Sequence, residues 1–404
     1  MGYRNEAVKG VGWMMALRGS TRSLSFVRRL ILARILTPVD FGVFGIATLV
    51  LSFFEILTET GINVFLIQEK KKSDDYLNSA WVVSIIRGLI IGLVLFLATP
   101  FVSSFFNSPN SINLLYLMAI VPIVRGFINP SSVKFQKDLL FFKEFSYRNI
   151  ILFFDISVSI TAALITRSPI SFVYGMIVSA FVELFLSFLI KPTPRFIIEK
   201  KRFFKVIHRG KWLTLAGIFN YLYQRADDIA VGKLIDTTSL GIYQMAYTVS
   251  SFPITEIADV VSKVTFPVMS KFADDKKRLF RAYLMSTILI SIVIIPFGLI
   301  LYFYAREITV LLLGENWIPA IPVLKVLSVF GVVRSISGSS SALFLAVGKQ
   351  EYITVVTLVS ILGLFLPLFY FIRNFGVMGA AYSAISGSVV AVPFVIYFLY
   401  KVFK

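Results

Sequence analysis

The chain of 404 residues contains no cysteine and a single histidine. Without cysteine it can form no disulfide, no thiolate nucleophile and no cysteine-based metal site. Charged residues are scarce at 15% of the chain, whereas soluble proteins usually carry about a quarter. Acidic residues are the scarcer sign, 22 against 40 Lys and Arg, which leaves a formal net charge of +18. A soluble protein of this length would need more polar surface than this composition provides.

Apolar residues are correspondingly abundant. They make up 57% of the chain, 40 of them Phe, and the mean hydropathy is +0.82. A bilayer core of about 30 Å needs roughly 20 residues of helix, and apolar stretches of about that length predict twelve transmembrane spans. Their ranges are 11–36, 42–66, 80–101, 112–128, 148–165, 170–190, 212–231, 240–264, 282–304, 321–345, 352–372 and 376–400. The fold class expected is therefore an all-α membrane protein.

Basic residues alternate between the two sides of this predicted topology. With both termini in the cytoplasm, 25 of the 40 Lys and Arg residues fall in cytoplasmic segments and five in outside segments. This asymmetry is what the positive-inside rule predicts. The net charge is therefore explained by cytoplasmic loops and contacts with membrane lipids, and we expect no binding to nucleic acid. The first apolar stretch contains Arg18, Arg22, Arg28 and Arg29, so a cleavable signal peptide is not expected.

The two halves of the chain resemble each other at an offset of 199 residues. This shift places 33–53 over 232–252, with identities that include Gly42/Gly241 and Ala47/Ala246. Parallel repeats of six helices each are predicted, an N-terminal lobe over 1–200 and a C-terminal lobe over 201–404. The basic segment 191–211 would link them, and its part 202–212 is either an interfacial helix or a plain loop.

Eighteen charged residues fall inside the predicted spans. Each would cost roughly 3 kcal/mol if it faced lipid at a helix centre, so most need a polar interior. At about 100° per residue, polar side chains form a narrow stripe on each of the first, second and seventh predicted helices. The stripes are Arg18, Arg22, Ser25 and Arg29; Thr48, Ser52, Glu55 and Glu59; and Gly217, Asn220, Gln224 and Asp227, with Asp228 at the edge. They predict a water-filled cavity between the two halves.

Arginine is in excess among these charges, and its planar fork matches phosphate oxygens. A phosphate-bearing substrate is therefore predicted, although carboxylated sugars fit equally well. The candidate substrate-binding residues are Arg18, Arg22, Arg29, Arg125, Arg225, Asn220 and Gln224. The candidates for ion coupling or charge pairing are Glu55, Glu59, Asp227 and Asp228. Purely structural salt bridges, for instance between Arg29 and Glu59, are the alternative, and Arg28 is expected to snorkel to the interface.

A membrane enzyme such as a glycan polymerase is the less favoured function. The predicted outside loops are short and contain almost no candidate acids or bases, and the single histidine, His208, lies in the basic segment. Adjacent acids such as Asp227 and Asp228 diverge by about 100° on a helix and do not form a metal clamp. We therefore expect no catalytic residue, no metal and no cofactor.

Several short motifs, in this order and spacing, resemble those of a known family. They are the run LARILTPVDFGVF at 32–44, with 60–62, 66–68, 224–228, 232–234, 240–243, 266–270, 313–317 and 376–381. Together they resemble the O-antigen-type polysaccharide-export flippases of the multidrug/oligosaccharidyl-lipid/polysaccharide exporter superfamily. The resemblance implies two six-helix lobes in a V-shaped, MATE-like transporter with alternating access, without the extra terminal helices of some members.

The resemblance also implies a substrate and partners. The substrate would be an oligosaccharide on a polyprenyl pyrophosphate, flipped from the cytoplasmic to the outer leaflet during polysaccharide biosynthesis. The protein would be a monomer in the inner membrane of a prokaryote, working with a polysaccharide polymerase and other assembly proteins. A cation-coupled drug or metabolite antiporter of the same superfamily is the runner-up, and the arginine stripe argues against it.

Overall fold

The computed structural model is built from helices throughout the part of the chain it describes, which comprises residues 2–59, 61, 62, 66, 73–197 and 200–404. Within that part, side chains are described except those of 2–11, 73–75, 200–213, 215, 216, 252, 253, 255, 256, 259, 260 and 263. The chain divides into two compact units, Met1–Arg225 and Ala226–Lys404. The division into lobes at residue 200 stays a prediction, and most side chains of the linker 191–211 lie outside the described residues.

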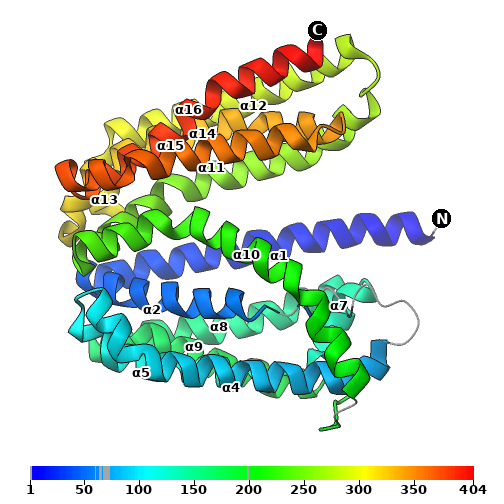
Figure 1. Ribbon diagram of the computed structural model, residues 1–404, viewed down its shortest axis with the longest axis vertical. Helices are drawn as coiled ribbons and strands as arrows, with labels where there is room; N and C mark the ends of the chain where they lie inside the picture. The colour runs from blue at the N-terminus through cyan, green and yellow to red at the C-terminus, as the bar shows by residue number, and fades with distance from the viewer. Residues whose placement is uncertain (1, 60, 63–65, 67–72, 198–199) are drawn as a thin grey trace. The chain divides into compact units, whose positions relative to one another are not determined.

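The first unit contains the helices α1, α2 and α4 to α9 and most of α10 (Figure 1). The long helices are α1 (Gly2–Ile35), α2 (Pro38–Leu57), α4 (Ser73–Phe105), α8 (Phe141–Thr166), α9 (Ile170–Phe188) and α10 (Lys200–Leu234). Between α4 and α8 lie the short elements η1 (Pro109–Ser111), α5 (Ile112–Met118), α6 (Ile120–Gly126), η2 (Pro130–Val133) and α7 (Lys134–Lys137). Helix α1 packs on α8, α8 on α9, and α4 on α6.

The second unit contains the end of α10 and all later helices. These are α11 (Thr237–Lys271), α12 (Lys276–Phe303), α13 (Ala305–Leu312), η3 (Glu315–Ala320), α14 (Ile321–Ala346), α15 (Gln350–Phe375) and α16 (Val377–Phe403). Helix α14 lies at the centre of this unit and packs against α11, α12 and α16, and α15 packs on α16. Large apolar side chains remain exposed on these helices, such as Leu366, 78% exposed, and Phe303, 69% exposed. Such surfaces are suited to lipid.

Helix starts and ends follow the predicted repeat. Helix α1 ends at Ile35 and α10 at Leu234, and α2 and α11 begin at Pro38 and Thr237, so each pair is 199 residues apart. The caps correspond as well. Thr37 accepts a hydrogen bond from the amide of Asp40, whose carboxylate in turn accepts from the Thr37 amide at 2.8 Å. Asp236 caps α11 by accepting from the Ser239 amide at 2.7 Å. In α2 the cap residue provides the hydroxyl and the third helical residue the carboxylate. In α11 the cap residue provides the carboxylate and the third helical residue the hydroxyl.

Eight helical segments of the described chain are long and apolar enough to cross a membrane. A ninth candidate is Pro109–Gly126 with Pro130–Lys137, if this pair, bent by 70°, forms one span. The long helices α1, α10 and α11 are not among these segments. Together these make the twelve that the sequence predicts, a number that stays a prediction. The expectation of an all-helical, multi-pass membrane protein is confirmed.

Four predicted spans differ from the helices in the structure. The predicted span 112–128 is two helices, α5 and α6, that meet at Ala119. Pro122 accounts for the break, because its ring clashes with the carbonyl of Met118, the last residue of α5. Helices α1, α10 and α11 extend beyond their predicted apolar stretches, since hydropathy marks the part of a helix that crosses lipid rather than the whole helix.

Candidate functional site

The basic stripe predicted on the first helix is solvent-accessible in the structure. Arg18, Arg22 and Arg29 are all exposed on α1, and Ser25 between them is half-buried. Their spacing of four, three and four residues places them on one face of a helix. Guanidinium groups held on one face of a rigid helix can bind an anion with several phosphate oxygens.

Arg28, next to this stripe, is directed into the first unit instead. Its guanidinium forms an ion pair with Asp155 of α8, and both side chains are only 13% exposed. The ring of Phe172 on α9 lies 5.7 Å from the guanidinium carbon, within the range of a cation–π contact. The prediction that Arg28 snorkels to the interface is therefore wrong, because a buried acid on a neighbouring helix neutralises it where it stands.

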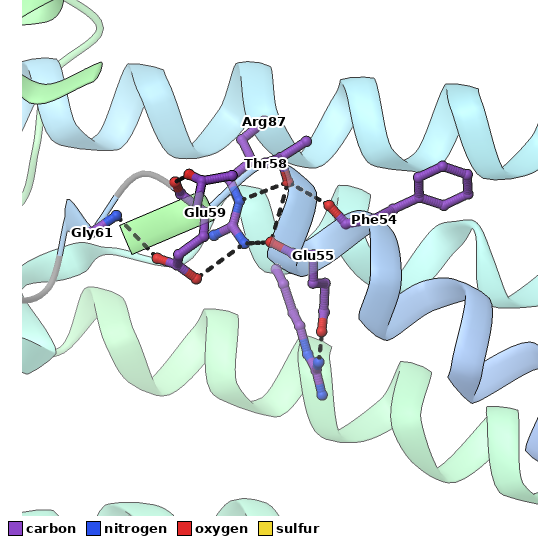
Figure 2. A network of polar contacts seen from close by, with 8 residues as sticks. Phe54, Glu55, Thr58, Glu59, Gly61 and Arg87 are labelled. Atoms are coloured by element: carbon purple, nitrogen blue, oxygen red, sulfur yellow. Dashed lines mark hydrogen bonds and ion pairs between the residues drawn. The ribbon is translucent and has the colours of Figure 1, made fainter. Parts of the chain in front are cut away.

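Glu55, in the last turn of α2, belongs with Glu59 to a network with Arg87 of α4 (Figure 2). Glu59 lies two residues beyond the end of α2, so the polar stripe predicted on one helix ends at Glu55. Arg87 donates to the Glu55 carbonyl at 2.6 Å and to the Thr58 hydroxyl at 3.1 Å. Its Nη2 lies 3.5 Å from the Glu59 carboxylate, which also accepts from the amide of Gly61 at 3.0 Å. Arg87 thus satisfies carbonyl and hydroxyl groups at the C-terminal end of α2, where a cation is favourable.

The Glu55 carboxylate points away from Arg87 (Figure 2). It meets a different cation, Arg125 in the last turn of α6, at 3.5 Å. The close packing of α4 and α6 places the two arginines. A Cβ at Gly88 would lie 2.4 Å from the Pro122 carbonyl oxygen and 2.9 Å from Gly126 Cα, so only glycine permits this approach. Arg87 and Arg125 directly precede these two glycines.

The polar stripe on α10 is attached to α2 by its neighbours. Tyr221 donates to the Leu49 carbonyl at 2.6 Å, and Thr214 to the Glu59 carbonyl at 2.6 Å. Asn220 and Gln224 are exposed, and the Gln224 side-chain amide donates a hydrogen bond of 3.0 Å to the Asn220 side-chain oxygen. Arg225, at the end of the first unit, is exposed. Amide and guanidinium groups in this arrangement can donate to sugar hydroxyl or phosphate oxygens.

Asp227 and Asp228 are buried in the second unit, 7% and 5% exposed. Asp227 accepts from the hydroxyl of Tyr243 on α11 at 2.7 Å and from the backbone amide of Asp228 at 2.9 Å. One turn along α11, the Tyr247 hydroxyl accepts from Arg334 of α14 at 2.9 Å. The Tyr243 hydroxyl and the Asp228 amide thus give the buried Asp227 carboxylate polar partners. The described residues contain no group of three His, Cys, Asp or Glu side chains that could hold a metal ion.

Sequence reasoning missed several members of these clusters. Arg87, Asp155 and Arg334 are recognisable in the sequence as charges inside predicted spans, but they lie on none of the three stripes. Tyr243 and Tyr247 gave no signal at all beyond their place in an apolar helix. The example of Arg29 paired with Glu59 is not what the structure shows for Glu59, whose carboxylate lies against Arg87.

The family assignment follows from comparison with known proteins. Residues 31–322 match the model of a family described as "Polysaccharide biosynthesis protein". The chain belongs to this polysaccharide biosynthesis family. The family resemblance predicted from the short motifs is thereby confirmed.

Two known proteins are similar to this chain over most of its length. An uncharacterized membrane protein in the cps region of Klebsiella pneumoniae is 27% identical over 94% of this chain and 79% of its own length. The lipopolysaccharide biosynthesis protein WzxC of Escherichia coli (strain K12) is 23% identical over 87% of this chain and 72% of its own length.

Solved structures share the fold of this family member. The lipid II flippase MurJ in an inward closed conformation superposes with a TM-score of 0.76, at 14% identity, over 97% of this chain and 89% of that one. An inward-facing MATE multidrug resistance transporter of the MOP superfamily gives a TM-score of 0.67, at 16% identity, over 94% of both chains. The prediction of a MATE-like helical fold is therefore confirmed.

Proposed function

We propose that the protein is a flippase that moves a polyprenyl-pyrophosphate-linked oligosaccharide from the cytoplasmic to the outer leaflet during polysaccharide biosynthesis. The observation that carries the proposal is the exposed arginine stripe Arg18, Arg22 and Arg29 on α1. In a membrane protein of a polysaccharide biosynthesis family, a row of permanently charged arginines favours an anionic substrate. A pyrophosphate group offers several phosphate oxygens that these guanidinium groups can bind.

The remaining assignments extend this proposal. Arg125, Arg225, Asn220 and Gln224 would complete the substrate contacts. The two compact units would be the two lobes of an alternating-access transporter, placed in the inner membrane of a prokaryote with both termini in the cytoplasm. The glycan would reach the protein from membrane-bound assembly enzymes and leave it for a polymerase, with the flippase working as a monomer.

A transporter accounts for the observations better than a polymerase. The same fold is found in a flippase and in MATE transporters. A cation-coupled antiporter is the second candidate, and the buried acids Asp227 and Asp228 are the observation in its favour. In the flippase, the same acids would serve ion coupling. Drug susceptibility of cells with and without the protein separates the two candidates.

The arginine stripe is tested by replacement. The triple variant Arg18→Ala, Arg22→Ala and Arg29→Ala should abolish surface polysaccharide, measured in a deletion host as the amount of exported polymer. Each single variant should reduce it about tenfold or more, since a charge-assisted contact contributes roughly 1.5–3 kcal/mol. The matched control is Arg278→Ala. Arg278 is an exposed arginine in the first turn of α12, and this variant should export normally. Normal export by the triple variant at wild-type membrane levels would refute the proposal.

A further inference from the structure

Two ion pairs of the first unit differ sharply in their surroundings. Arg28 and Asp155 are each 13% exposed, between α1 and α8. Arg125 and Glu55 are 40% and 35% exposed, and their closest atoms are 3.5 Å apart. A pair that is open to solvent and at the long limit of a hydrogen bond contributes little to stability. The Arg125–Glu55 pair therefore has no evident structural purpose.

The backbones of both residues are nevertheless firmly held. The Glu55 carbonyl accepts a hydrogen bond of 2.6 Å from Arg87. Arg125 precedes Gly126, where a Cβ would lie 2.8 Å from the Ser84 carbonyl oxygen, so α6 cannot move closer to or slide over α4 at this point. Two fixed backbones thus present a carboxylate and a guanidinium that can meet or separate by side-chain rotation alone.

Arg125 also has unused capacity. A guanidinium carries five N–H donors, and Arg125 contacts the Glu55 carboxylate through one nitrogen, Nη1. Asp155 of α8 is also near enough to interact with its charge. A phosphate group binds such a fork through two parallel hydrogen bonds. An exposed carboxylate with a single long contact is a poor competitor for it.

We propose that Glu55 is an internal counter-anion of Arg125, and that a phosphate group of the substrate displaces it. The inference rests on the proposed function. Glu55 pairs with Arg125 when no substrate is bound. The apparent affinity for phosphate is then the intrinsic affinity multiplied by the fraction of protein in which Arg125 is free of Glu55. It takes the guanidinium back when the phosphate leaves, and so favours release.

The test measures binding of inorganic pyrophosphate to the full-length protein in lipid nanodiscs. Glu55→Gln removes the competing charge and should tighten binding about two- to fivefold, the range set by the strength of an exposed pair. Arg125→Gln should weaken binding, and the double variant should bind no more tightly than Arg125→Gln alone. Glu55→Asp, which keeps the charge on a shorter side chain, should fall between wild type and Glu55→Gln. A merely structural role for Glu55 would predict weaker binding in every variant.

Glu183→Gln is the matched control. Glu183 pairs with Arg148 at 3.0 Å, and that arginine is 46% exposed, but neither residue belongs to the network at α2. The affinity of the Glu183→Gln variant for pyrophosphate should equal that of the wild type. The proposal is overturned if Glu55→Gln binds no more tightly than wild type, if Glu183→Gln tightens binding equally, or if the gain survives in the double variant. Failure of the proposed function would appear elsewhere, as normal export by the variant that lacks all three stripe arginines.

Discussion

Arg28 and Arg29 are neighbours in the sequence but take different positions on α1. Arg29 belongs to the exposed stripe, whereas Arg28 lies about 100° further around the helix and meets Asp155. Of these two adjacent residues, Arg29 is therefore accessible to a substrate, whereas Arg28 attaches α1 to α8. This division could not be predicted from α1 alone, because it depends on the acid of α8.

The buried pair gives the first prediction at this scale. Asp155→Ala leaves the Arg28 guanidinium buried without its carboxylate, and should lower the free energy of unfolding by about 3–5 kcal/mol. The double variant Arg28→Leu with Asp155→Leu should recover most of this loss, because it removes both charges together.

Unfolding of the purified protein in detergent, followed by circular dichroism, measures the effect. Glu351→Ala serves as the control, since Glu351 and its partner Lys349 are 60% and 51% exposed and the loss should stay within about 1 kcal/mol. Equal losses for Asp155→Ala and Glu351→Ala would show that burial does not strengthen the dependence on the pair.

At the scale of helices, the contact between α4 and α6 determines where Arg87 and Arg125 stand. The glycines that permit it, Gly88 and Gly126, could be read from the sequence, but their meeting could not, because no pattern within one helix reveals its neighbour. The same limit explains why the stripes on α1, α2 and α10 were predicted while the partners of Glu55 and Glu59 were not. Periodicity places a side chain on a face; packing decides what it meets.

Gly88→Ala tests this contact. The added methyl would meet the Pro122 carbonyl oxygen at 2.4 Å, so α4 and α6 must separate, at a cost of about 1–3 kcal/mol. Gly19→Ala on α1 is the control, because nothing lies within 4 Å of its new methyl group and alanine favours a helix by about 1 kcal/mol. Melting temperatures in detergent should fall for the first variant and stay level or rise for the second. The idea fails if both variants melt alike.

For the whole molecule, composition and charge asymmetry sufficed to predict an all-helical membrane protein, and the motifs sufficed for its family. Helices with one long apolar stretch were predicted closely, as for 321–345 against α14, Ile321–Ala346. Charged helices such as α10 were predicted too short, because their ends lie among basic residues that carry no hydropathy signal. The site was predicted only as separate stripes, because the pattern within one helix does not reveal which helix packs against it.

The topology is open to a direct test, because a chain without cysteine gains a single thiol from any one substitution. Thr166→Cys, exposed at the end of α8, should react with a membrane-impermeant maleimide added to cells with a permeabilised outer envelope. Asp274→Cys, exposed between α11 and α12, should react only after the inner membrane is opened. The reverse pattern would place the termini outside.

The caps of α2 and α11 have a consequence for how such proteins diverge. A threonine followed three residues later by an aspartate starts one helix, and an aspartate followed by a serine starts the other. Either order of acid and hydroxyl satisfies the same amide, so both positions can change while the helix keeps its first residue. If the halves descend from one ancestral gene, their kinship is recorded in the spacing of helix boundaries after residue identity has faded. Searches for ancient duplications in membrane proteins would then gain more from aligning helix starts than from counting identical letters.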